Sequence, residues 1–201
     1  FKKIKTTSVE KKEISPVSLM PPGLTASLRK DEFIDLISFL SALGKEGEFK
    51  VPSGRYVRRW KILPNDSKTS GLIRTKGIQH TLNGKNDLPW KSAYSFVNAE
   101  LPLSEMGINN GFNNRLSIAK FEIEVAIAGE IGIRLNNPLG LQLLTGGEMI
   151  DAKKETSFSF NQGRHEIFVI VDTDTRKDNL LFELIDIKPI ILAKILCPHS
   201  Q

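Results

Sequence analysis

The chain has 201 residues, 40% hydrophobic and 25% charged, which suits one large globular domain or two small ones. No apolar run approaches the roughly 20 residues that a membrane-spanning helix needs, so we expect no membrane span. Lys and Arg exceed Asp and Glu by 28 to 23. The excess is diffuse, and its densest group is Arg55, Arg58, Arg59 and Lys61. Because no recognisable nucleic-acid-binding module accompanies this group, we expect a solvated basic face and no nucleic-acid partner.

The single cysteine, Cys197, limits the chemistry of the chain. One thiol cannot form an internal disulfide, a cysteine-rich zinc site or a Cys-x-x-Cys-His haem attachment. Cys197 and His199 are two possible metal ligands near the end of the chain, but a frayed tail is the favoured interpretation. The chain opens with Phe1 and a charged segment that is not a signal peptide, so we expect it to come from a longer precursor.

The N-terminal part contains one strongly predicted helix. Residues 1–14 alternate weakly, which predicts an edge strand, and prolines between 16 and 22 then exclude regular structure. Acidic residues at 31 and 32 favour the start of a helix, and Gly44 favours its end. Apolar residues recur between them at the spacing of an amphipathic helix: Phe33, Leu36, Ile37, Leu40 and Leu43.

The rest of the chain has the pattern of an antiparallel β-protein. Residues 45–55 are glycine- and proline-containing and predict a linker, residues 56–63 a strand, and residues 64–70 a loop. From Lys120 onward, short alternating segments are separated by turn sequences every eight to twelve residues. This spacing is typical of a β-sandwich or barrel rather than of a parallel sheet.

We therefore expect a mainly β fold, an antiparallel sandwich of the jelly-roll or protective-antigen-like kind, preceded by a short helical segment. The predicted organisation is an N-terminal piece (1–44), a linker (45–55), the sandwich (56–189) and a tail (190–201).

A family resemblance begins in the helical segment. Residues 15–44 read SPVSLMPPGLTASLRKDEFIDLISFLSALG, with a Ser-x-Met-Pro-x-Gly-Leu turn before the helix. This stretch resembles the closing segment of the cytochrome c-like haem-binding domain of large exported planctomycete and verrucomicrobial proteins. The continuation, GKEGEFKVPSGRYVRRWKIL, is similar to the linker that follows in those proteins. Residues 90–103, 140–150 and 161–172 look like a carbohydrate-binding-like sandwich domain that often comes next.

The resemblance implies one site residue. Met20 would be the axial thioether ligand of a haem c iron, and the alternative is that Met20 packs as a core residue at the helix entrance. The attachment cysteines and the proximal histidine are absent from the 201 residues. An upstream haem or dehydrogenase-like domain, or a separate chain, would have to provide them.

Other candidates have a structural alternative that is at least as strong. Trp60, Trp90 and Tyr94 can stack on sugar rings if they are exposed, and core packing is the alternative. The loop with Asp172, Asp174, Asp178 and Asn179 is rich in oxygen, but a solvated connection is favoured over a calcium site. For His165, we expect a hydrogen-bonded structural histidine rather than a catalytic base.

These observations favour a non-catalytic segment of an exported (periplasmic or extracellular) haem protein, which completes a haem domain and carries a docking or ligand-binding sandwich. Catalysis by this chain alone lacks support, since no nucleophile, base and orienting group occur in a plausible pattern. The alternative is a stand-alone carbohydrate-binding or adhesion module without haem, with polysaccharide as its partner.

Overall fold

The computed structural model describes residues 13, 23, 25–47, 49–84, 86–111, 113–187 and the backbone of 193–195. The chain divides into two compact units, residues 1–43 and residues 44–201. The strand predicted over residues 1–14 lies outside the described residues except for Glu13.

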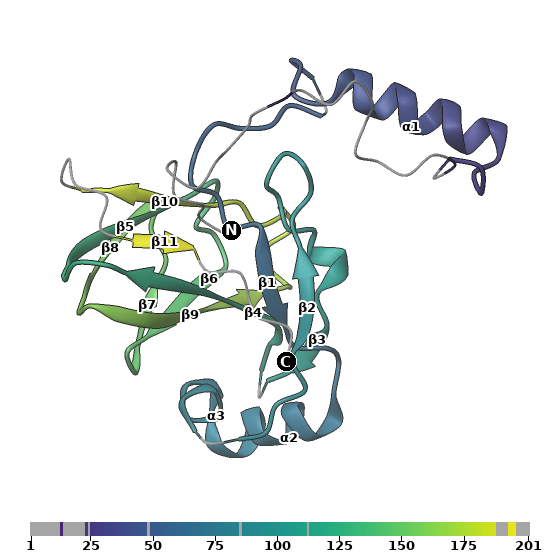
Figure 1. The fold of residues 1–201 in the computed structure, drawn as a ribbon. Helices are drawn as coiled ribbons and strands as arrows, with labels where there is room; N and C mark the ends of the chain where they lie inside the picture. Colours follow the sequence, from purple (N-terminus) through teal and green to yellow (C-terminus); the bar gives the residue numbers. More distant parts are fainter. Residues whose placement is uncertain are drawn as a thin grey trace. The chain divides into compact units, whose positions relative to one another are not determined.

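The first unit contains helix α1 (Lys30–Ala42), which confirms the predicted amphipathic helix (Figure 1). At its start, the Arg29 backbone N–H donates a hydrogen bond to Glu32 Oε2 at 2.8 Å, which satisfies a donor that the helix leaves unpaired. At its end, Leu43 N–H still donates to the Phe39 carbonyl. Gly44 follows with φ of +79°, a conformation that glycine adopts without steric cost.

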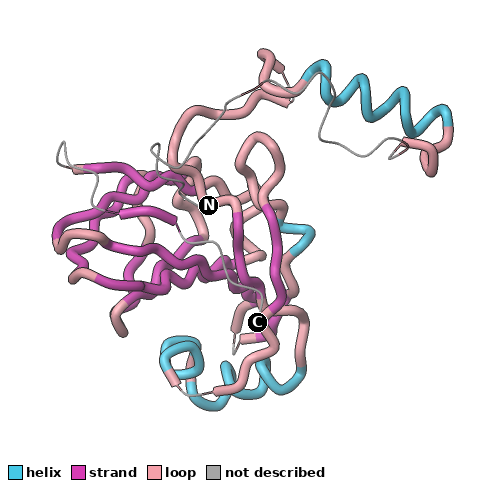
Figure 2. Tube along the Cα trace, viewed as in Figure 1, coloured by secondary structure: helices cyan, strands magenta, loops and turns pink. Residues whose placement is uncertain are grey.

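The second unit is a sandwich of two antiparallel sheets (Figures 1 and 2), which confirms the predicted fold class. The large sheet has the order β2-β1-β4-β9-β6-β7, with β3 and β11 also paired to β4, and the small sheet has the order β10-β5-β8. The strands are β1 (Arg59–Ile62), β2 (Lys91–Tyr94), β3 (Ile108–Asn110), β4 (Arg115–Val125), β5 (Gly129–Leu135), β6 (Leu141–Thr145), β7 (Glu148–Asp151), β8 (Glu155–Phe160), β9 (Gly163–Asp172), β10 (Phe182–Asp186) and β11 (Ala193–Ile195).

The core between the sheets follows from the alternation along the strands. On β4, Phe121, Ile123 and Val125 are buried, whereas Ile127 lies beyond the strand and is exposed. Inward residues of β5 and β10 form the opposite wall of the same core: Ile131, Ile133, Leu135, Phe182 and Leu184. A continuous apolar layer therefore joins the two sheets.

Two helices that the sequence analysis does not predict cover part of the other face of the large sheet. Helix α2 (Ser67–Lys76) begins inside the segment predicted as a loop, residues 64–70, and α3 (Ile78–Asn83) follows it. Asp66 explains the start of α2, because its carboxylate accepts hydrogen bonds from Thr69 N and Thr69 Oγ1, each at 2.7 Å. A second apolar cluster holds this layer to the sheet: Leu63, Ile73, Leu82, Leu116, Ile118, Leu144, Phe168 and Ile170.

The chain returns to the sheet near its end. Strand β11, which lies inside the segment 190–201, pairs with β4, with Ala193 opposite Val125.

None of the described helices is long and apolar enough to cross a bilayer.

Candidate functional site

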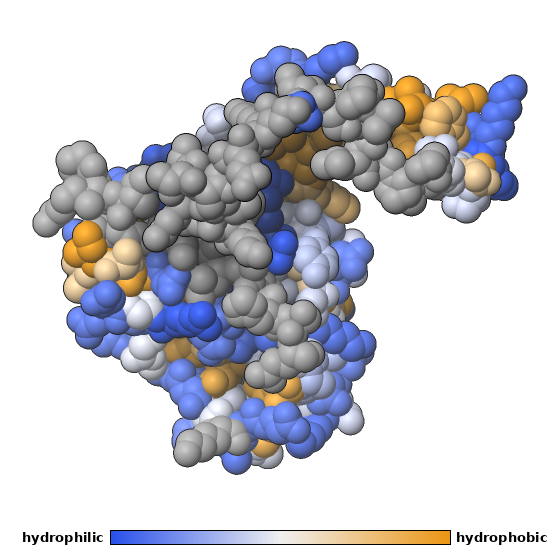
Figure 3. Space-filling view, in the orientation of Figure 1, coloured by the Kyte–Doolittle hydropathy of each residue, from blue (hydrophilic) through white to orange (hydrophobic). Residues whose placement is uncertain are grey.

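The first candidate surface is the apolar face of α1. No residue of this 13-residue helix is buried. Leu40 is 52% exposed, and exposed side chains run along the helix and just past it: Phe33, Ile34, Leu36, Ile37, Leu40 and Leu43. Figure 3 shows hydrophobic surface, in orange, over α1. We refer to these six residues as the α1 stripe.

The turn that precedes α1 is described only in part. Met20, the predicted haem ligand, lies outside the described residues, as do Cys197 and His199. Gly23 has φ of +89°, which suits a glycine, and its carbonyl accepts a hydrogen bond from Ala26 N at 2.9 Å. Among the described residues, no group of three His, Cys, Asp or Glu side chains is arranged to hold a metal ion.

Trp60 is not a sugar-stacking residue, which corrects one of the three aromatic candidates. It is 1% exposed, and its ring meets the rings of Phe121 and Phe182 edge to face at centroid distances of 5.2 and 5.4 Å. Its indole N–H donates to Ser95 Oγ at 2.9 Å. Trp60 is thus the centre of the core, with its one polar atom satisfied.

The other two aromatic candidates differ in exposure. Trp90 is half-buried, packs against Phe168 and has the Lys120 ammonium 4.8 Å from its ring centroid. Tyr94 is 63% exposed on β2, which is the edge strand of the large sheet, and Phe96 just beyond it is 57% exposed. The structure therefore separates the three aromatic candidates, and only Tyr94 presents an open ring.

His165 makes the hydrogen-bond contact expected from the sequence. Its Nε2 lies 2.8 Å from the carbonyl oxygen of Asn161, and its ring lies 4.7 Å from that of Phe160. It is half-buried at the beginning of β9.

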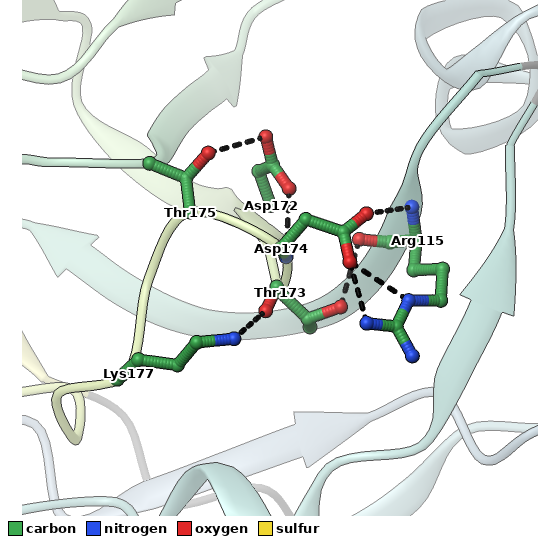
Figure 4. Close-up of polar contacts among 6 residues, drawn as sticks. All are labelled: Arg115, Asp172, Thr173, Asp174, Thr175 and Lys177. Atoms are coloured by element: carbon green, nitrogen blue, oxygen red, sulfur yellow. Dashed lines mark hydrogen bonds and ion pairs between the residues drawn. The ribbon is translucent and has the colours of Figure 1, made fainter.

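The acidic loop after β9 uses its oxygens to bind protein donors (Figure 4). Asp172 accepts hydrogen bonds from Asp174 N at 2.9 Å and from Thr175 Oγ1 at 3.0 Å. Asp174 accepts from Arg115 Nε at 2.8 Å. The hydrogen bond from the Arg115 guanidinium lowers the pKa of the Asp174 carboxyl and raises the pKa of Arg115. These contacts fit an ordered polar connection.

A buried arginine in the same loop is the residue that the sequence analysis misses. Arg176 is 1% exposed, and its guanidinium donates to four backbone carbonyls and to one side-chain amide oxygen. The acceptors are the carbonyls of Asn137, Leu139, Asp178 and Asn179 and the side chain of Asn136. Burial lowers the pKa of Arg176. No local signal in the sequence marks this role, because the acceptors and Arg176 lie on segments about forty residues apart.

Beside the Arg176-held turn lies a cavity of about 510 Å³ on the outer face of the large sheet. We call it the outer basin. Outward residues of neighbouring strands line it together with the turn 137–140: Leu116, Gln142, Asp151, Ile170 and Asp172. Asn114, just before β4, is also part of the lining.

Comparison of the chain with models of protein families, with curated proteins and with solved structures finds no match.

Proposed function

We propose that residues 1–44 complete a cytochrome c-like haem domain of an exported redox protein, and that the sandwich is its docking or ligand-binding module. The observation that carries this proposal is the α1 stripe. An isolated helix of 13 residues is marginal in water, and most of its stability comes from packing its apolar face. The stripe therefore requires a partner surface.

The turn before the helix supports the choice of partner. Met20-Pro21 comes about ten residues before the start of α1 in the sequence, and Gly23, which lies between them, has a positive φ. A thioether at this position would supply one side of a haem, whose bound iron carries the electron. The chain holds no Cys-x-x-Cys-His. The attachment cysteines and the proximal histidine would thus belong to an upstream domain or a separate chain, which α1 contacts through its stripe.

The spectrum of the natural haem-containing protein tests the assignment of Met20. We expect Met20→Ala to shift the Soret band, because the axial ligand changes, whereas Met149→Ala on β7 leaves the spectrum unaltered. An unchanged spectrum in Met20→Ala contradicts the ligand assignment.

A second pair of variants tests the stripe. Leu40→Glu introduces a charge into the apolar contact and is expected to weaken association of unit 1 with the haem domain. Ser38→Glu introduces the same charge at an exposed position outside the stripe and is the matched control. Equal haem content and equal helicity in both variants would contradict docking through the stripe.

The alternative function is a stand-alone polysaccharide-binding module without haem. It is favoured by the outer basin and by the open ring of Tyr94. Pull-down of the full chain with insoluble polysaccharides tests it, and the absence of retention on any of them would contradict it.

A further inference from the structure

We propose that the outer basin binds a neutral sugar residue of an oligosaccharide. The inference rests on the ligand-binding role proposed for the sandwich and is independent of the haem. It places the ligand in a cavity on the outer face of the large sheet rather than on the aromatic candidates.

The floor of the outer basin combines an apolar strip with polar sides. Leu116 and Ile170 are buried at 6% and 2% exposure, and they belong to the apolar cluster under α2 and α3. Gln142 and Asp151 lie on one side of the strip, and Asp172 and Asn114 complete the lining. A sugar ring offers this combination, since its C–H groups contact apolar atoms while its hydroxyls need hydrogen bonds.

A hydrogen bond between two lining residues of the outer basin positions two further acceptor atoms. Gln142 Nε2 donates to Asp151 Oδ1 at 2.9 Å across the β6–β7 pair. This bond orients Gln142 Oε1 and Asp151 Oδ2, and neither atom has a hydrogen-bond partner among the described residues. Both atoms can accept hydrogen bonds from ligand hydroxyls.

The wall of the basin is held in place before a ligand arrives. The turn 137–140 is fastened by Arg176, which donates to the carbonyls of Asn137 and Leu139. Gly140 has φ of +66°, and its carbonyl accepts from Asp172 N at 2.9 Å. A wall fixed in this way loses little conformational entropy on binding.

The charges of the lining select the class of ligand. Asp151 and Asp172 carry carboxylates, and no Lys, Arg or His is among the lining residues. Anionic ligands such as phosphates or uronic acids are therefore disfavoured. Both oxygens of Asp172 already accept hydrogen bonds from protein donors, which argues against a cation site.

The size of the outer basin also suits a sugar. Its volume of about 510 Å³ lies within the range of small-ligand sites.

The test uses the full chain on an array of neutral oligosaccharides (glucans, xylans, mannans and galactans), with oligogalacturonate and heparin as acidic comparisons. We expect binding to at least one neutral class and weaker binding to both acidic probes. Titration with the best neutral oligosaccharide then compares four variants. Gln142→Ala and Asp151→Asn are each expected to weaken binding about tenfold or more. Gln162→Ala, at an exposed position outside the basin, is the control and is expected to stay within about twofold of the parent. Tyr94→Ala tests the rival site on the open aromatic ring.

Thermal unfolding of each variant shows whether its fold is intact, and Asp151→Asn keeps the shape of the side chain. Loss of binding in Tyr94→Ala, with both basin variants unaffected, overturns the basin while keeping a sugar-binding sandwich. Preference for the acidic probes also overturns the proposal. The absence of binding to every probe overturns both the basin and the polysaccharide role, whereas the haem spectrum remains a separate test.

Discussion

At the scale of single residues, the buried Arg176 connects two segments that are distant in the sequence. Its five hydrogen bonds join the turn before β6 to the loop after β9. The two segments are about forty residues apart in sequence, so a local pattern cannot reveal the connection. Asp172 and Asp174, which resemble metal ligands in the sequence, instead accept hydrogen bonds within this loop.

Arg176→Met should destabilise the chain by about 2–4 kcal/mol, since it removes a buried guanidinium that donates to four partly buried carbonyls. Urea unfolding followed by tryptophan fluorescence measures the loss. Arg115→Met is the matched control, because it removes an exposed ion pair with Asp174 and should cost much less. Equal losses in the two variants would contradict the clamping role of Arg176.

Trp60 shows why the sequence alone could not predict whether an aromatic side chain points into the core or toward solvent. Its strand is buried on the side that faces Phe121 and Phe182, while Arg59 on the same strand is exposed. A four-residue strand in a basic segment gives too short a pattern to orient the ring. The contacts of Trp60 with Phe121 on β4 and Phe182 on β10, both far along the chain, place its ring in the core.

At the scale of elements, α2 is a helix that its own sequence favours only weakly. It contains Gly71, which lowers helix propensity, and the apolar contact that stabilises it comes chiefly from Ile73 against the large sheet. The capping carboxylate of Asp66 sets where the helix begins, and the hydrogen bond from the Thr69 hydroxyl lowers the pKa of Asp66. Tertiary packing explains why a helix replaced the predicted loop.

Gly71→Ala should stabilise the chain by about 0.5–1 kcal/mol, because the added methyl meets no atom within 4 Å and removes backbone freedom from the unfolded chain. Gly107→Ala should have the opposite effect, since its new Cβ would lie 2.2 Å from backbone atoms of Pro64 and Asn65. Thermal unfolding of both variants checks the pair. A destabilised Gly71→Ala would show that α2 differs from the helix described here.

At the scale of the whole molecule, both apolar cores of the described residues lie within the second unit. The apolar cores consist of residues from 57 to 184, and α1 has no buried residue. We therefore expect residues 44–201 to unfold with a free energy within about 1 kcal/mol of that of the full chain. Urea unfolding of both polypeptides measures this difference. A loss of several kcal/mol on removal of residues 1–43 would show that the units stabilise each other.

The sequence by itself determined the amphipathic helix and the short antiparallel strands after Lys120, because these depend on periodicity and on turn residues close together in the chain. Only the tertiary structure decided that Trp60 is buried, that α2 and α3 cover the large sheet, and that Arg176 supports the outer basin. Each of these depends on contacts between distant segments, which local spacing does not encode. The α1 stripe was visible as a pattern, and its exposure became evident from the fold.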